Sequence, residues 1–90
     1  MKVRLFATLR DVSDVAEVDV APAGERVRDV LQALVERHPA LQAELFLPDG
    51  SLKPLVQVFV NGRNIHFTGG LETPVGEGDA IAVFPPVAGG

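Results

Sequence analysis

A single stretch of helical periodicity, flanked on both sides by strand-like segments, constrains the fold more than any other feature. Between residues 25 and 38, apolar side chains recur three and four positions apart, which places them on one face of a helix. They are Val27, Val30, Leu31, Leu34 and Val35. Pro39 ends this helix because proline disfavours the α conformation of the residue before it. One amphipathic helix needs a partner surface, so the flanking segments are expected to form a sheet that covers its apolar face.

The other apolar segments alternate with polar residues or are rich in β-branched residues, which is typical of strands. The predicted strands are residues 2–9, 16–20, 55–60, 64–67 and 80–84. Residues 10–14 have the composition of a turn, and Asn61-Gly62 predicts a tight hairpin. A short helical turn is predicted over residues 41–46, and residues 68–79 are expected to return the chain to the last strand.

This order of elements indicates an α+β fold. If the last strand lies beside the first, antiparallel hairpins and a parallel pair share one mixed sheet of four to five strands, with one main helix on one face. That arrangement is a β-grasp roll. Ninety residues suffice for one core, so we predict one domain over residues 1–84, followed by a flexible C-terminal tail over residues 85–90.

Composition excludes several classes of protein. The absence of cysteine excludes a disulfide framework, a thiolate metal site and a cysteine nucleophile. The formal net charge of −4 argues against nucleic acid as a partner. The sequence has neither an apolar run long enough to span a membrane nor a secretory signal, so we expect a cytoplasmic protein with no membrane partner.

Charge is distributed unevenly along the sequence. No Lys or Arg follows Arg63, whereas Glu72, Glu77 and Asp79 lie beyond it. This acidic segment has two interpretations: it docks to a basic protein surface, or it forms an ordinary solvated face.

The residue patterns typical of catalysis are missing. His38 and His66 have no second ligand at metal-binding spacing, which predicts no metal site. Ser13 and Ser51 lie in turn composition rather than at a strand-to-helix elbow. The glycine pairs do not open a helix, so no phosphate-binding loop is predicted. The chain alone is therefore not expected to be a catalyst.

The unusual feature is Pro85-Pro-Val-Ala-Gly-Gly90, which directly follows the last predicted strand. The prolines favour an extended start, which reduces the entropy lost when a partner binds the segment. Six extended residues span roughly 20 Å. Gly89 and Gly90 lack a Cβ, so a narrow channel can admit them. Although a frayed end is the alternative, the pattern favours threading into a partner's active site by Pro85, Pro86, Val87, Ala88 and Gly89.

Three segments carry a resemblance to a known family. They are Phe6-Ala-Thr-Leu-Arg10, Gly78-Asp79 and Val83-Phe-Pro-Pro-Val-Ala-Gly-Gly90. Over essentially its whole length the chain resembles the ubiquitin-like β-grasp sulfur carriers, a group that contains the small subunit of molybdopterin synthase and the sulfur carrier of thiamine synthesis. The tail is especially similar to the molybdopterin synthase subunit.

The resemblance implies a chemical role for Gly90. Its carboxylate would be adenylated with Mg-ATP by an adenylyltransferase similar to the ubiquitin-activating enzyme, and then converted to a sulfur-donating thiocarboxylate. The chain itself would bind no cofactor, and would act as a co-substrate or as the small subunit of a synthase. The further partner implied is the large subunit of molybdopterin synthase or a cysteine synthase. Phe6 and Phe84 match apolar positions that face partners in this family, although core packing is the alternative for both.

One departure from the molybdopterin synthase subunit leaves the pathway open. The segment 63–73 is longer here, and with residues 45–50 and 58–61 it is similar to a sulfur carrier for cysteine synthesis and to the archaeal small modifier proteins. The leading hypothesis is a sulfur carrier for molybdopterin synthesis. The alternatives are a carrier for cysteine synthesis, a modifier that joins Gly90 to lysines of other proteins, and an interaction domain with an inert tail. We also predict that the tail is mobile until a partner binds it.

Overall fold

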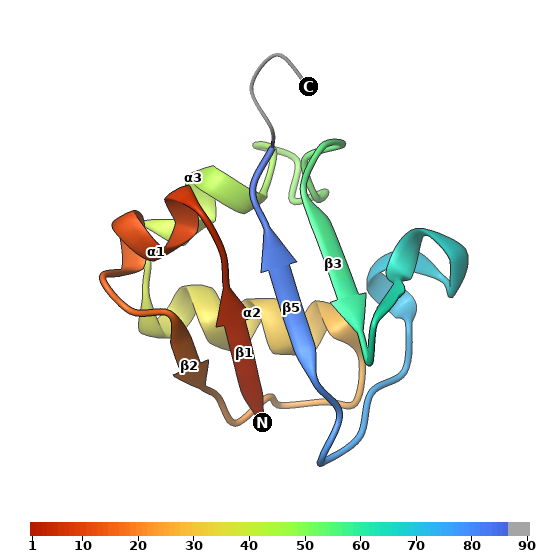
Figure 1. Ribbon diagram of the computed structural model, residues 1–90. Coiled ribbons are helices and arrows are strands. Elements are labelled where there is room, and N and C mark those ends of the chain that lie inside the picture. Colours follow the sequence, from red (N-terminus) through yellow and green to blue (C-terminus); the bar gives the residue numbers. More distant parts are fainter. Residues whose placement is uncertain (87–90) are drawn as a thin grey trace.

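The computed structural model describes residues 1–86 and shows a five-stranded sheet with one long helix across it (Figure 1). The strands are β1 (Lys2–Leu5), β2 (Glu17–Asp19), β3 (Gln57–Val60), β4 (Arg63–Asn64) and β5 (Ile81–Phe84). The helices are α1 (Thr8–Ser13), α2 (Val27–Arg37) and α3 (Leu41–Leu45), with short 3-10 helices η1 (Ile65–Phe67) and η2 (Gly70–Glu72). Within residues 1–86, no helix is long and apolar enough to cross a membrane.

The strand order is β2-β1-β5-β3-β4, so the last strand lies at the centre of the sheet. β1 pairs antiparallel with β2 and parallel with β5, where Val3 lies opposite Ile81 and Leu5 opposite Val83. β3 pairs antiparallel with both β4 and β5. The predicted mixed sheet, with its last strand beside the first, is confirmed.

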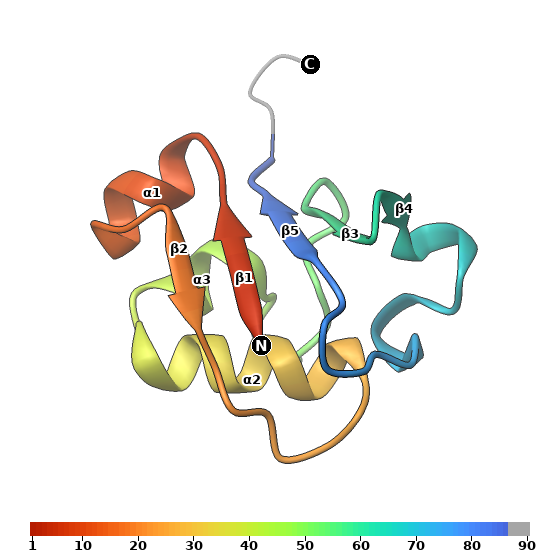
Figure 2. The same cartoon turned by 60° about the horizontal axis from the view of Figure 1, so that its bottom comes forward.

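The core lies between α2 and one face of the sheet (Figure 2). Alternation along the strands turns every second side chain toward the helix, so these residues are at most 1% exposed. On the sheet they are Val3, Leu5, Val58, Ile81 and Val83, and on α2 they are Val27, Val30, Leu31 and Leu34. The predicted helix over residues 25–38 is confirmed with its ends at Val27 and Arg37.

The strand predicted over residues 2–9 is wrong beyond Leu5, and the turn predicted over residues 10–14 is largely the helix α1. The chain turns where Leu9 N–H donates to the Phe6 carbonyl at 3.2 Å, with Ala7 at φ 52°, ψ −130°. These angles are those of the first central residue of a type II′ turn, a position that glycine usually occupies. Alternation alone could not reveal a turn that lacks its usual glycine.

The return strand predicted over residues 64–67 is also wrong for most of its length. Asn61-Gly62 makes the predicted tight turn, with φ of 51° and 81°, but β4 contains only Arg63 and Asn64. The Asn64 side chain accepts a hydrogen bond from His66 N–H and caps η1, which takes the chain out of the sheet. A second 3-10 helix, η2, lies within the loop predicted over residues 68–79.

A polar link joins the β3–β4 turn to the segment before β5. The Asn61 amide nitrogen donates to Asp79 Oδ1 at 2.9 Å, and Ala80 N–H donates to the Asn61 side-chain oxygen at 2.8 Å. The hydrogen bond from Asn61, with one from Gly76 N–H, lowers the pKa of Asp79 below its usual range. These contacts fix where β5 begins and therefore its register in the sheet.

Candidate functional site

The candidate site lies at the sheet edge where β1 and β5 end side by side. Because these two strands run parallel, the residues that follow them meet at the same edge, and Phe6 N–H donates to the Val83 carbonyl at 3.2 Å. Pro85 is buried against the domain, whereas Pro86 is exposed. Val87, Ala88, Gly89 and Gly90, to which we assign threading and chemistry, lie outside the described residues.

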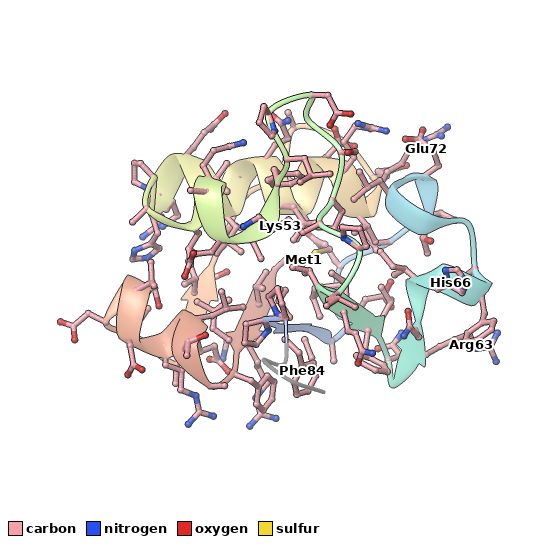
Figure 3. All side chains as sticks on the ribbon, turned by 90° about the horizontal axis from the view of Figure 1, so that it is seen from above. Met1, Lys53, Arg63, His66, Glu72 and Phe84 are labelled. Atoms are coloured by element: carbon pink, nitrogen blue, oxygen red, sulfur yellow. The ribbon has the colours of Figure 1, made fainter. Side chains whose placement is uncertain are left out.

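An aromatic cluster covers the side of the sheet that faces away from α2. The rings of Phe6 and Phe84 are stacked, with centroids 4.3 Å apart and planes 11° apart. Phe59 meets Phe84 edge-on at 5.5 Å. All three side chains are partly exposed, and Figure 3 shows Phe84 on the side of the sheet opposite the helix α2. Neither Phe6 nor Phe84 belongs to the buried core.

Small residues leave a shallow groove beside these rings. Ala80 and Ala82 alternate with Ile81, which points to the core, and Gly62 also lines the groove. The groove has a volume of about 320 Å³. We name the surface formed by Phe6, Phe59, Ala82 and Phe84 the aromatic face. It adjoins the start of the C-terminal segment because Phe84 immediately precedes Pro85.

Two arginines flank the aromatic face. The guanidinium carbons of Arg4 and Arg10 lie 5.7 Å and 5.4 Å from the centroid of the Phe6 ring, within cation–π range. Arg10 Nε also donates to the Leu5 carbonyl at 2.8 Å, which fixes the stem of the side chain. Among residues 1–86, neither guanidinium forms a salt bridge.

The acidic residues beyond Arg63 are used mainly within the protein. Glu72 accepts hydrogen bonds from Arg28 at 2.7 Å and 2.8 Å and from Arg26 at 2.9 Å. The Arg28 contact is the main cause of the lowered pKa of Glu72. Asp79 is bound to the Asn61 amide, as described above. The segment therefore supplies internal contacts, and the cations are the groups that surround the aromatic face.

The serine and histidine side chains that the sequence offered as candidates for catalysis or metal binding have structural positions. The Ser13 hydroxyl is buried, and its one proton has two backbone acceptors, the carbonyls of Leu9 and Val15, each 2.9 Å away. His38 caps the C-terminus of α2, and His66 lies in η1. In the part of the chain that the structure describes, no three metal-ligating side chains gather into a group that could hold an ion.

Comparison with known proteins places these features in a family. The sequence model of the ThiS family matches residues 3–90. The chain belongs to the ThiS family. This is a family of ubiquitin-like sulfur carriers with a β-grasp fold, so both the resemblance and the fold predicted from the sequence are confirmed.

Relatives of this ThiS-family chain match nearly all of its length. A protein of Archaeoglobus fulgidus, described provisionally as a sulfur carrier protein, is 52% identical over 91 residues that cover 100% of this chain and 98% of the relative. The crystal structure of SAMP1 from Haloferax volcanii is 40% identical, with a TM-score of 0.88 over 100% of this chain and 98% of that one. A chain in the crystal structure of the Amycolatopsis orientalis BexX/CysO complex is 30% identical, with a TM-score of 0.84 over 99% and 98% of the two chains.

The structure adds residues that our sequence analysis missed in this ThiS-family member. Phe59, Arg4 and Arg10 join Phe6 and Phe84 around one surface. Strand alternation contained part of this signal, because Val58 is buried and its neighbour Phe59 must then face outward. The position of Arg10 depends on the type II′ turn after Phe6, which the sequence pattern did not reveal.

Proposed function

We propose that this protein is a sulfur carrier whose Gly90 carboxylate is adenylated and converted to a thiocarboxylate. The observation that carries the proposal is the aromatic face beside the start of the C-terminal segment, in a chain of the ThiS family. A partner that binds this face would receive the segment after Pro85 in its active site. Five extended residues, 86–90, reach about 17 Å from the domain.

The chemistry requires only a carboxylate on this chain. Adenylation joins an oxygen of the Gly90 carboxylate to the α-phosphorus of ATP and releases pyrophosphate, with Mg²⁺ and ATP held by the activating enzyme. Hydrosulfide, or an equivalent sulfur nucleophile, then attacks the acyl carbon, AMP leaves and a proton passes to solvent. The side chains of residues 1–86 take no part in these steps, so their proposed roles are docking and positioning.

The test is the intact mass of the protein isolated from its source organism, with fragment masses to locate any change. Replacement of one oxygen by sulfur in the C-terminal fragment supports the proposal. Localisation is essential because oxidation of Met1 changes the mass almost equally. An unmodified terminus that stays unmodified with the activating enzyme, Mg-ATP and a sulfur donor overturns it.

Two variants test the assignment of Gly90 itself. Deletion of Gly90, or addition of one residue after it, is expected to abolish pyrophosphate release while leaving the unfolding transition unchanged. Adenylation of either variant at the normal rate would show that Gly90 is not the reacting residue.

A second candidate function is protein modification. The similarity to SAMP1, a small archaeal modifier protein, favours it specifically. In this case an acceptor lysine amine attacks the acyl carbon of the Gly90 adenylate, AMP leaves, a proton passes to solvent and an isopeptide bond forms. Larger species that release a lysine-linked Gly-Gly remnant after proteolysis would support modification, and their absence would favour the carrier alone.

We propose molybdopterin synthesis as the pathway, on the resemblance of the tail, residues 85–90, to that of the molybdopterin synthase small subunit. The thiocarboxylated protein is expected to convert a cyclic pyranopterin precursor in the presence of the large synthase subunit. Sulfur transfer to an activated serine derivative with a cysteine synthase, and none to the pterin, would replace this assignment by the cysteine pathway.

A further inference from the structure

The arginines beside the aromatic face are conspicuous in a protein with a net charge of −4. Three other basic side chains, Lys2, Arg26 and Arg28, are paired with carboxylates of the protein. Among residues 1–86, Arg4 and Arg10 form no salt bridge, as is also true of Arg37, Lys53 and Arg63. What distinguishes Arg4 and Arg10 is that both lie over the Phe6 ring. Glu17 lies opposite Arg4 in the β1–β2 pairing, but its ion-pair partner is Lys2, at 3.8 Å.

Contacts within the protein position both guanidinium groups before a partner binds. Arg10 is anchored by its hydrogen bond to the Leu5 carbonyl, and both groups rest near the same aromatic ring. Side chains already ordered in this way lose less conformational entropy on binding than free ones. Arginine presents its donors in a planar fork that matches a carboxylate, and it is enriched at protein interfaces.

We infer that the activating enzyme meets this surface with an apolar patch flanked by carboxylates, which pair with Arg4 and Arg10. The apolar patch fits the aromatic face and its groove of about 320 Å³. Charge complementarity selects an acidic partner surface, because no carboxylate of residues 1–86 pairs with Arg4 or Arg10. The inference rests on the proposed function, since it names the chemistry of the partner that adenylates Gly90.

The test measures binding of the full-length protein to the activating enzyme of its source organism by calorimetry, at low and high ionic strength. Arg4→Glu and Arg10→Glu are each expected to weaken binding about fivefold at low ionic strength, and the double variant at least about tenfold. The double variant should also lose most of the salt dependence that the wild type shows.

Arg37→Glu is the matched control, because Arg37 is exposed on α2, on the far side of the sheet, and the substitution changes the net charge equally. It should bind as the wild type does. Arg4→Lys and Arg10→Lys are expected to retain most of the salt dependence, since they keep the charge. If Arg10→Glu fails to fold because the Leu5 contact is lost, Arg4→Glu alone carries the test.

The outcomes separate the two proposals. Wild-type protein that is adenylated, with arginine variants that bind as tightly as Arg37→Glu, overturns the acidic partner surface and leaves the carrier function intact. Tighter binding by the glutamate variants would indicate a basic partner surface and also overturn the inference. Wild-type protein that the enzyme does not adenylate at all contradicts the proposed function instead.

Discussion

At the scale of single residues, Ala7 holds the backbone in a conformation that suits glycine. Its φ of 52° and ψ of −130° place it in a region that side chains with a Cβ rarely occupy, between β1 and α1. The turn brings Phe6 and Arg10 together beside the C-terminal segment. Backbone strain is therefore located next to the aromatic face rather than in the core.

Ala7→Gly should stabilise the protein. Removing the Cβ relieves strain of about 1–3 kcal/mol, while the greater freedom of glycine in the unfolded chain costs about 0.4–1 kcal/mol. We expect a net gain of about 1 kcal/mol in the free energy of unfolding, measured by urea denaturation. A loss of stability would mean that the angles at Ala7 are not strained in solution.

Gly62 and Gly76 form a pair that isolates the effect of backbone angle. A Cβ at either position meets no atom within 4 Å, but only Gly62 has a positive φ, at 81°. Gly62→Ala should lower the free energy of unfolding by about 1 kcal/mol. Gly76→Ala should raise it by about 0.4–1 kcal/mol, because alanine restricts the unfolded chain. Urea denaturation of both variants checks this, and equal changes would contradict it.

At the scale of elements, the sequence predicted the helices and strands whose hydrophobic pattern extends over many residues. The apolar stripe on α2 and the alternation of apolar residues along β1, β3 and β5 were sufficient for the prediction, because burial in the core requires apolar residues at these positions. α1 and η1 could not be predicted, since each begins at a local event: the Ala7 turn or the Asn64 cap. Two rings of the aromatic face, Phe6 and Phe84, came from the resemblance, whereas Phe59 was missed. Of the flanking arginines, Arg4 follows from the alternation of β1 and only Arg10 depends on the turn at Ala7.

The Glu72 carboxylate joins the η2 element to two arginines at the start of α2, beside backbone hydrogen bonds such as the one from Val27 N–H to the Thr73 carbonyl. The hydrogen bond from Arg28, followed by the Arg26 contact, lowers the pKa of Glu72, so at a given acid pH the unfolded chain binds more protons than the folded protein. This stabilisation is complete above the unfolded pKa, about 4.3, and is lost as pH falls through the lower folded value.

Glu72→Gln should therefore lower the urea midpoint at pH 7, and the difference from the wild type should narrow below about pH 4. The effect is expected to be small because all three side chains are exposed. Glu77→Gln is the control, since Glu77 forms no salt bridge within residues 1–86. A difference that persists unchanged at acid pH would show that the ion pairs are not its cause.

At the scale of the whole molecule, the sheet separates stability from the proposed function. One face, with Val83, makes the core against α2, and the other, with Ala82, carries the groove. Adjacent residues of β5 thus face opposite sides of the sheet. Substitutions on the two faces should have different consequences even one position apart.

Ala82→Glu should reduce the rate of adenylation by more than about tenfold while changing the free energy of unfolding by about 1 kcal/mol or less. Val83→Ala should lower the free energy of unfolding by about 2 kcal/mol, because it leaves a cavity in the core, and preserve adenylation by the folded protein. Pyrophosphate release and urea denaturation of both variants test the separation. Equal losses of activity would contradict it.

The central position of β5 also affects how the chain folds during its synthesis. Without residues 81–84, the first two strands and the β3–β4 pair have no strand to join them into one sheet. Domains acquire their structure as units while the ribosome extends the chain. A nascent chain interrupted before residue 84 thus lacks the strand that unites its core, together with the aromatic ring that Phe84 adds to the outer face. Incomplete translation products should consequently be left unfolded for proteolysis rather than compete for the proposed partner enzymes.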